Sequence, residues 1–112
     1  MVKHKGQYMV WIDVEPEVEK EWNKWIDEKH LPEILKRGKF LAAHRYVVKE
    51  GQGPAKYLNV YDAESLKAVK KYREGPGKAI SEDYMKRYGK TTKITRLVVK
   101  EIKCVEAPRQ YK

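Results

Sequence analysis

Two tryptophans and a histidine in the first third of the sequence are the strongest indication of chemistry. Trp22, Ile26 and His30 follow one another at intervals of four residues, and Trp25 lies between the first two. On a helix this spacing places the three residues on one face, with Trp25 beside it. Imidazole titrates near neutral pH, so burial or a charged neighbour can tune His30 as an acid or a base. The pattern also fits a structural histidine that packs in the core and helps to end a helix before Pro32.

A second group of candidate residues lies in the apolar segment 56–61. Asn59 is unusual there, because asparagine is depleted in strands and a buried amide needs hydrogen-bond partners. Its amide could donate to a substrate carbonyl or a developing enolate, or it could bond to a neighbouring strand or a water. Alternation along a strand places Tyr57 and Tyr61 on the same face as Asn59. These tyrosines either pack in the core or use their hydroxyls to assist a proton transfer.

The adjacent residues His44 and Arg45 add two ionisable groups in a predicted strand. They must point to opposite faces, so at most one of them shares a side with a given pocket. Arg45 could bind a carboxylate or phenolate, or it could form a salt bridge at a subunit boundary. His44 is the less favoured candidate of the two.

No metal site or cofactor motif is expected. His4, His30 and His44 lack the spacing of metal ligands, and Cys104 has no second cysteine to assist it. We expect Cys104 to be a small buried side chain near the end of a strand. The glycine-rich turn at 51–53 lacks the further glycines and the following helix of a dinucleotide-binding loop.

The length of 112 residues fits one domain, which we place at 1–106, followed by a polar tail at 107–112. Such a domain is too small to enclose a deep active site unless subunits share its walls, so an oligomer is expected. The single cysteine excludes an internal disulfide, and the first residues lack the apolar run of a signal peptide or membrane anchor. We expect a cytoplasmic protein that does not bind membranes.

The net charge of +9 raises the question of nucleic-acid binding. Most of the excess lies in the second half of the chain, scattered over several predicted elements, which favours solvated surfaces over a dedicated polyanion site. Segment 56–61 also lacks an aromatic ring at Asn59, where an RNA-recognition motif needs its second stacking residue. Nucleic acid is therefore an unlikely partner, although an RNA-binding domain stays as an alternative.

The order of predicted elements is β-α-β-β-α-β. Pro16 suits a helix start, Pro32 interrupts that helix and opens a short second one, and Asp62 and Ser81 are predicted helix caps. The predicted strands are 8–14, 40–48, 56–61 and 92–105, and the predicted helices are 16–29, 32–37, 63–74 and 82–88. This order indicates a ferredoxin-like α+β fold, in which helices cover one face of an antiparallel four-stranded sheet. The other sheet face carries apolar residues and requires a partner.

The chain resembles the dimeric α/β-barrel superfamily and, within it, small proteins similar to the EthD (ethyl tert-butyl ether degradation) family. The residues that carry the resemblance are Trp25-Ile26-Asp27-Glu28-Lys29-His30-Leu31-Pro32-Glu33, Gly38-Lys39-Phe40, Ala43-His44-Arg45-Tyr46 and Tyr57-Leu58-Asn59-Val60-Tyr61-Asp62. The resemblance implies a homodimer whose two sheets pack face to face into a barrel, with a pocket between sheet and helices in each subunit. It also implies which residues line that pocket, namely Trp22, Trp25 or Ile26, and His30, closed by Tyr84 and Tyr88. The expected ligand is small, flat and apolar, of an aromatic or polyketide-like kind.

These observations together predict a cofactor-independent enzyme. His30 would act as general acid or base, and Asn59 or Tyr57 would stabilise a developing oxyanion. The reaction would be of the isomerase, cyclase, lyase or monooxygenase type. Haem proteins also occur in the superfamily, but no residue here selects haem. The main alternative is a non-catalytic small-molecule-binding or assembly module, in which His30 only packs.

Overall fold

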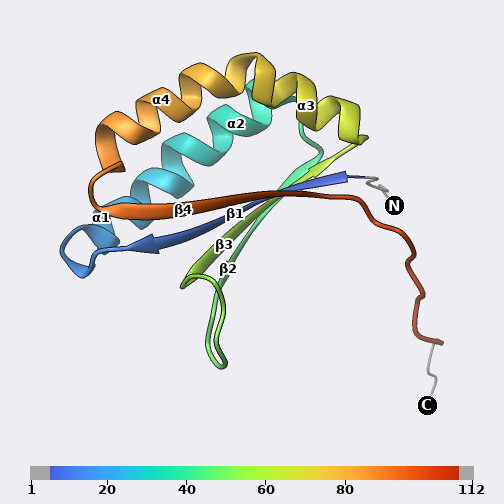
Figure 1. Cartoon of the computed structure of the whole chain (residues 1–112), viewed down its shortest axis with the longest axis horizontal. Helices are drawn as coiled ribbons and strands as arrows, with labels where there is room; N and C mark the ends of the chain where they lie inside the picture. The colour runs from blue at the N-terminus through green and yellow to red at the C-terminus, as the bar shows by residue number, and fades with distance from the viewer. Residues whose placement is uncertain (1–5, 109–112) are drawn as a thin grey trace.

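The computed structural model describes residues 6–108, in which two helical runs lie over one face of a four-stranded antiparallel sheet (Figure 1). The elements are β1 (Gly6–Val14), α1 (Pro16–Trp25), the π-helical turn η1 (Ile26–His30), α2 (Leu31–Gly38), β2 (Ala42–Val47), β3 (Tyr57–Ala63), α3 (Leu66–Glu74), α4 (Pro76–Tyr88) and β4 (Thr92–Val99). The strand order in the sheet is β2-β3-β1-β4. The predicted ferredoxin-like α+β fold is confirmed.

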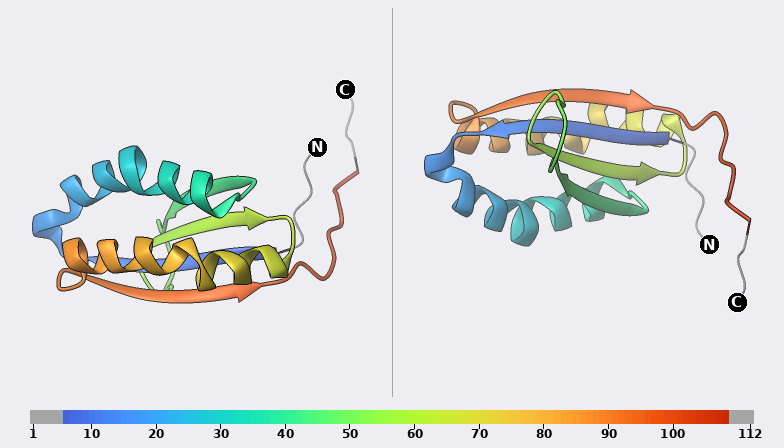
Figure 2. Two further views of the ribbon diagram at one scale, coloured as in Figure 1. Left: turned by 90° about the horizontal axis from the view of Figure 1, so that it is seen from above. Right: turned by 90° about the horizontal axis from the view of Figure 1, so that it is seen from below.

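The register of the sheet decides which side chains face the helices. In β1, Tyr8 pairs with Tyr61 of β3, and Val10 pairs with Asn59. On its other side Val10 pairs with Arg96 of β4. Side chains alternate along each strand, so these rows share the face beneath the helical runs, which lie side by side above it (Figure 2). Tyr57, Asn59 and Tyr61 thus share one face, as the alternation predicted.

Two clusters of buried side chains fill the space between the sheet and the helices. One is rich in aromatic rings and contains Tyr8, Phe40, Tyr61 and Tyr72. The other lies under α1 and α4, and its buried members are Ile12, Trp22, Ile26, Tyr84 and Tyr88. Val10 and Leu31 pack against both clusters and connect them. A cavity described below opens between these clusters.

The helix that follows β1 does not stop at Pro32 as predicted. It continues from α1 through η1 into α2, and the residue before the proline, Leu31, keeps a right-handed helical conformation (φ −60°, ψ −49°). The N–H of Leu31 donates to the carbonyl of Ile26, five residues back. Proline has no N–H to donate and its ring clashes with the preceding turn, so a wide π turn lets the helix pass it without a break.

Two predicted helix caps are wrong. Asp62 lies within β3, and the N-cap of α3 is Ser65, whose hydroxyl accepts a hydrogen bond from the N–H of Ala68 at 3.1 Å. Ser81 lies inside α4, which begins at Pro76 directly after Gly75. The N–H groups of the first helical turn have no partner within the helix, so a proline there costs no hydrogen bond. α4 can therefore begin at Pro76, with only Gly75 between it and α3.

The last strand is shorter than predicted. β4 ends at Val99, and the described residues after it have no regular secondary structure. Cys104 is therefore exposed and lies outside any strand, contrary to the prediction of a buried position. β2 likewise begins at Ala42 rather than Phe40, which is buried in the core ahead of the strand. No helix in the described part of the chain is long and apolar enough to cross a membrane.

No helix of residues 6–108 covers the second face of the sheet (Figure 2). Its outward side chains include Tyr46 and Leu97, which are 53% and 42% exposed, and the half-buried Met9, Trp11 and Leu58. We call these five residues the open face.

Candidate active site

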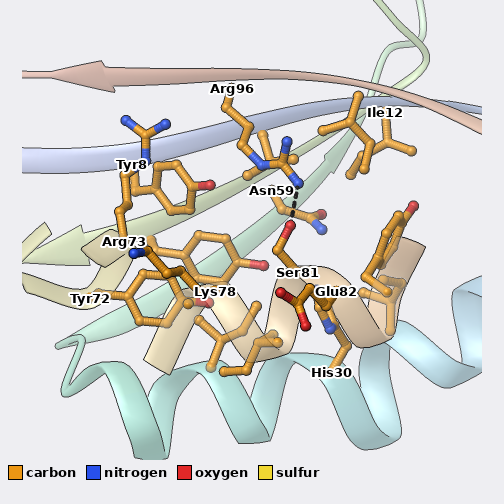
Figure 3. Close-up of a pocket in the computed structure, with 18 residues that line it drawn as sticks. Tyr8, Ile12, His30, Asn59, Tyr72, Arg73, Lys78, Ser81, Glu82 and Arg96 are labelled. Carbon is orange, nitrogen blue, oxygen red and sulfur yellow. Dashed lines mark hydrogen bonds between the residues drawn. The ribbon is translucent and has the colours of Figure 1, made fainter. Parts of the chain in front are cut away.

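A cavity of about 340 Å³ lies between the helix-covered face of the sheet and the helices above it. The sheet contributes Tyr8, Val10, Ile12, Asn59, Tyr61, Ile94 and Arg96, and the helices contribute Ile26, His30, Ile34, Tyr72, Arg73, Gly77, Lys78, Ile80, Ser81, Glu82 and Tyr84 (Figure 3). Aromatic and aliphatic side chains form the interior. This lining suits a small ligand with an apolar body and a few polar groups.

His30 is the last residue of the π-helical turn, which directs its imidazole into the cavity. The ring stacks on Trp25, with centroids 4.8 Å apart and planes at 24°, and it lies 5.3 Å from the ring of Tyr84. Among the described residues none forms a hydrogen bond with either ring nitrogen. The ring is partly buried, so an imidazole held by ring contacts alone can bind water or a ligand in the cavity. π-helical turns are frequent at functional sites.

The surroundings of His30 favour its neutral form. Burial among apolar rings lowers the pKa of His30 to about 4. The carboxylate of Asp83 opposes this shift, and the positive charge of Arg96 adds to it. At neutral pH the imidazole is therefore uncharged. It can accept a proton as a base, but it is not the protonated imidazolium that would act as an acid.

Asn59 is oriented by Arg45, which lies behind it on β2. The Nε of Arg45 donates to Oδ1 of Asn59 at 3.0 Å, and its Nη1 donates to Asp27 at 2.9 Å. With its carbonyl oxygen occupied, Asn59 has only its amide N–H groups left to donate, to Tyr61 or toward the cavity. Nη2 of Arg45 is buried and has no hydrogen-bond partner among the described residues.

Arg45 itself does not line the cavity. Its guanidinium lies 5.1 Å from the ring centroid of Trp22 and 5.5 Å from that of Tyr57. The salt bridge to Asp27 joins two elements of the same chain, β2 and η1, rather than two subunits. The ligand-binding role predicted for Arg45 thus finds no support in its position, and its observed contacts are structural.

A chain of hydrogen bonds fixes Tyr84 against the sheet. Nε1 of Trp22 donates to the Tyr84 hydroxyl at 3.0 Å, and that hydroxyl donates to Oγ1 of Thr92 at 2.9 Å. The Thr92 hydroxyl in turn donates to the carbonyl of Tyr88 at 2.7 Å. Tyr84 therefore presents its ring to the cavity while its hydroxyl is occupied.

The predicted site residues separate into two groups. Those that line the cavity are Ile26, His30, Asn59, Tyr61 and Tyr84, and those that do not are Trp22, Trp25, Arg45, Tyr57 and Tyr88. Trp25 supports His30 from behind and also lines a shallow outer groove. The hydroxyl of Tyr57 donates to Glu19 and accepts from Asn23, outside the cavity. The catalytic role predicted for Tyr57 is therefore not retained.

Three tyrosines pack together at the other end of the cavity. The ring centroid of Tyr8 lies 6.0 Å from that of Tyr61 and 6.1 Å from that of Tyr72. Burial raises the pKa of Tyr61 and of Tyr72, and the nearby Tyr8 adds to both shifts. Tyr61 and Tyr72 can therefore donate hydrogen bonds at neutral pH but cannot serve as bases.

Several lining residues were not identified from the sequence. The strand residues Tyr8, Ile12, Ile94 and Arg96 could have been found by extending the alternation rule from β3 to β1 and β4. Arg73, Lys78 and Glu82 had no such signal, because their positions depend on the break at Gly75 that turns α4 against α3. Among residues 6–108 no group of histidine, cysteine and carboxylate side chains could hold a metal ion.

Solved structures with a similar fold are known. An ethyl tert-butyl ether degradation (EthD) family protein from Bacillus halodurans matches with a TM-score of 0.68 at 17% identity, over 88% of this chain and 99% of that chain. The haem degrader MhuD from Mycobacterium tuberculosis, solved with two haems in its active site, matches with a TM-score of 0.64 at 19% identity, over 90% and 99% of the two chains. A dimeric ferredoxin-like protein from an uncultured marine organism has a TM-score of 0.59 at 16% identity, with coverage of 92% and 100%.

These identities establish a shared fold, and the fold confirms the resemblance to EthD-like, ferredoxin-like proteins. No curated protein matches the sequence. One family does match, over residues 6–102, which is most of the chain. The chain therefore belongs to the family described as "Domain of unknown function (DUF4286)".

Proposed function

We propose that this protein is a small-molecule enzyme in which His30 acts as a general base on a largely apolar ligand held in the cavity. The observation that carries the proposal is the imidazole of His30, which opens into a cavity of about 340 Å³ without a hydrogen-bond partner among the described residues. The ring is partly buried and faces the cavity, so its nitrogens can bind whatever occupies that space. Here ring contacts position the group and leave its nitrogens to a ligand.

The proposed step is removal of a proton from carbon next to a carbonyl. The low pKa of His30 makes it a weak base, so the carbanion must be stabilised as it forms. The amide of Asn59 can donate to the developing enolate oxygen, because Arg45 holds the opposite end of that amide. Reactions of the isomerase, cyclase, lyase and cofactor-independent monooxygenase types can each begin with such a step. The fold shared with the haem degrader MhuD is compatible with chemistry on a small molecule.

We also propose that two copies pair through the open face to form a dimeric α/β barrel. This face exposes Tyr46 and Leu97, and an exposed apolar sheet face without a covering helix calls for a partner. A similar fold occurs in the protein described as a dimeric ferredoxin-like protein. Pairing there would leave the cavity accessible, since it lies on the opposite side of the sheet.

Proton abstraction can be measured directly as hydrogen–deuterium exchange. We would incubate the protein in deuterated buffer with 2-tetralone, a small ketone whose ring is fused to benzene, and follow loss of its α-proton signals by NMR. The wild-type protein should accelerate exchange, and His30→Gln should reduce the acceleration by about 10²-fold or more. His44→Gln is the matched control, because His44 lies on the opposite sheet face and pairs with Asp62 at 2.8 Å.

Two results would contradict the proposal. Exchange in His30→Gln at the wild-type rate would remove His30 from the mechanism. Binding of the ketone to the wild-type protein without any exchange would instead favour the non-catalytic binding module. Binding is detected independently, as shifts of the His30 imidazole resonances.

The dimer is tested by sedimentation equilibrium. Tyr46→Lys together with Leu97→Lys should convert the dimer into a monomer, because two charges would be buried in an apolar interface. Met85→Lys is the control, since Met85 is equally exposed, at 48%, but lies on α4. A wild-type monomer, or a dimer that survives the double substitution, would contradict pairing through the open face.

A further inference from the structure

Three basic side chains from three different elements line the cavity. Arg73 comes from the end of α3, Lys78 from the start of α4 and Arg96 from β4 (Figure 3). We call these three cations the cationic rim. Glu82 is the one acidic residue in the lining, so the lining has a net charge of about +2.

The cations of the rim are not neutralised by ion pairs. Arg37, Arg45, Lys56 and Arg87 each lie within 4.0 Å of a carboxylate oxygen. Within the described residues Arg73, Lys78 and Arg96 form no such pair, although Glu82 lies in the same lining. Their charges are therefore available to an anion that enters the cavity.

Two of the three cations are nevertheless held in place. The guanidinium of Arg73 lies over the ring of Tyr8, 5.5 Å from its centroid, and Nη2 of Arg96 donates to Oγ of Ser81 at 3.1 Å. Both contacts position the side chain without consuming its charge, since a ring face and a hydroxyl are neutral. Side chains ordered in advance lose less entropy when a ligand binds.

The first turn of α4 adds to the positive potential of the rim. Gly77 belongs to this turn, is buried and lines the cavity. A β-carbon added at Gly77 would lie 2.7 Å from the carbonyl oxygen of Tyr72, so the close approach of α4 to α3 requires glycine here. The N-terminus of α4 therefore points its partial positive charge toward the same space as the three cations.

The positive charge acts inside the cavity as well as at its rim. Arg96 lowers the pKa of His30 and opposes the rise in the pKa of Tyr72 and of Tyr84, all of which line the cavity. His30 and Arg73 lie at opposite sides of the cavity in Figure 3. A ligand that spans it would thus meet Arg73 at one end and the neutral imidazole at the other, with Arg96 between them.

We propose that the ligand of this cavity is an organic acid, with a flat apolar body directed toward His30 and a carboxylate attracted by the positive charge of Arg73, Lys78 and Arg96. This inference rests on the proposed function and specifies its substrate class. A carboxylate fits because guanidinium and ammonium groups form their strongest hydrogen bonds with it. An uncharged ligand of the same shape would leave three cations facing an apolar body.

The test compares two ligands of nearly identical shape, 2-naphthoate and 2-naphthamide, which differ in charge. Their dissociation constants are measured by NMR titration of the wild-type protein. We expect the carboxylate to bind about tenfold more tightly or better, and increasing salt to weaken its binding more than that of the amide. Arg73→Glu and Lys78→Glu should each remove this preference while leaving the affinity for the amide within about twofold.

Lys71→Glu is the matched control. Lys71 is an exposed residue of α3, as Arg73 is, and the substitution changes the net charge of the protein by the same amount, but Lys71 does not line the cavity. It should keep the preference for the carboxylate.

The outcomes separate this inference from the proposed function. Equal affinity for the two ligands, or an equal loss in Lys71→Glu, would overturn the inference and leave the His30 cavity in place. If neither ligand shifts the resonances of cavity residues and 2-tetralone shows no exchange, both the inference and the proposed function are overturned.

Discussion

Two groups of polar side chains in and around the cavity differ in whether the protein satisfies them. In one group, which we call the closed wall, Arg45 binds Asn59 and Asp27, and Trp22 binds Tyr84, which binds Thr92. In the other group, the cations of the cationic rim form no ion pair and His30 forms no hydrogen bond with any described residue. The contacts of the closed wall stabilise the fold, whereas the rim and His30 are free to bind a ligand.

This difference shows why residue type alone does not identify a site. Arg45 and Tyr57 have side chains able to perform chemistry, yet both use them to connect elements of the closed wall. Arg73 and Lys78 look like ordinary surface cations in the sequence, yet their charges face the cavity. A residue is available for a ligand only if the rest of the protein has not already satisfied it.

The largest effect on stability should come from the closed wall. Trp22→Ala removes a fully buried indole and its hydrogen bond to Tyr84, so we expect the free energy of unfolding to fall by about 3–5 kcal/mol. Urea denaturation followed by circular dichroism measures this change. A loss below about 1 kcal/mol would show that the wall can collapse around the vacated space and would weaken the comparison.

The next largest effect should be the contribution of His30 to the pH dependence of the free energy of unfolding. The unfolded chain binds a proton on His30 near its reference pKa of about 6.5. The folded protein does not do so until the pH falls to about 4. The unfolded state therefore binds more protons in this window, and the free energy of unfolding falls as the pH drops from 6.5 to 4, by about 3 kcal/mol in total.

The His30 contribution is isolated by difference. His30→Gln should flatten the dependence of stability on pH between 6.5 and 4, while His44→Gln should leave the contribution of His30 intact. Chemical denaturation at a series of pH values measures both. Parallel curves for wild type and His30→Gln would show that the imidazole is not buried in its neutral form.

Arg45 should have an intermediate effect. Arg45→Met keeps the length of the side chain but leaves Oδ1 of Asn59 without its donor, so we expect a loss of about 1–3 kcal/mol in unfolding free energy. The control is Arg37→Met, which breaks an exposed pair with Glu33 and should cost less than about 0.5 kcal/mol. Equal effects in thermal melts of the two variants would contradict the assignment of Arg45 to the closed wall.

The smallest effect on stability should come from the cationic rim. Arg73→Ala and Lys78→Ala remove exposed side chains without ion pairs, so the free energy of unfolding should stay within about 0.5 kcal/mol of wild type. The melting temperature measures this. A marked destabilisation by either substitution would mean that the rim stabilises the fold, and the contrast between the rim and the closed wall would disappear.

Much of the fold could be predicted from the sequence because the local signals agree with one another. Apolar alternation, helix-starting prolines and glycine-rich turns all indicated βαββαβ, and the face shared by Tyr57, Asn59 and Tyr61 followed from alternation alone. The boundaries were less accurate. Pro32 ends a helix in the usual case, but here a π turn absorbs the missing hydrogen bond, which a local rule does not foresee.

The candidate site was predicted only in part, for a physical reason. His30, Ile26 and Asn59 were found because their types are unusual for their elements or their spacing marks a helix face. Whether a polar side chain is free depends on partners that are far away in the sequence, such as Asp27 for Arg45, 18 positions apart. Tertiary contacts of this kind leave no local pattern.

The π-helical turn also lets the helix hold one extra residue without changing the direction in which α2 faces. An α-helical residue advances by about 100° around the axis, and a π turn has more residues per turn, so Ile26–His30 cover roughly the rotation of four α-helical residues. Ile34 therefore keeps its buried position in α2. In evolutionary terms, the turn is equivalent to a one-codon insertion that is absorbed locally, so the packing of α2 is kept while the side chains of the turn, His30 among them, are displaced from α-helical positions.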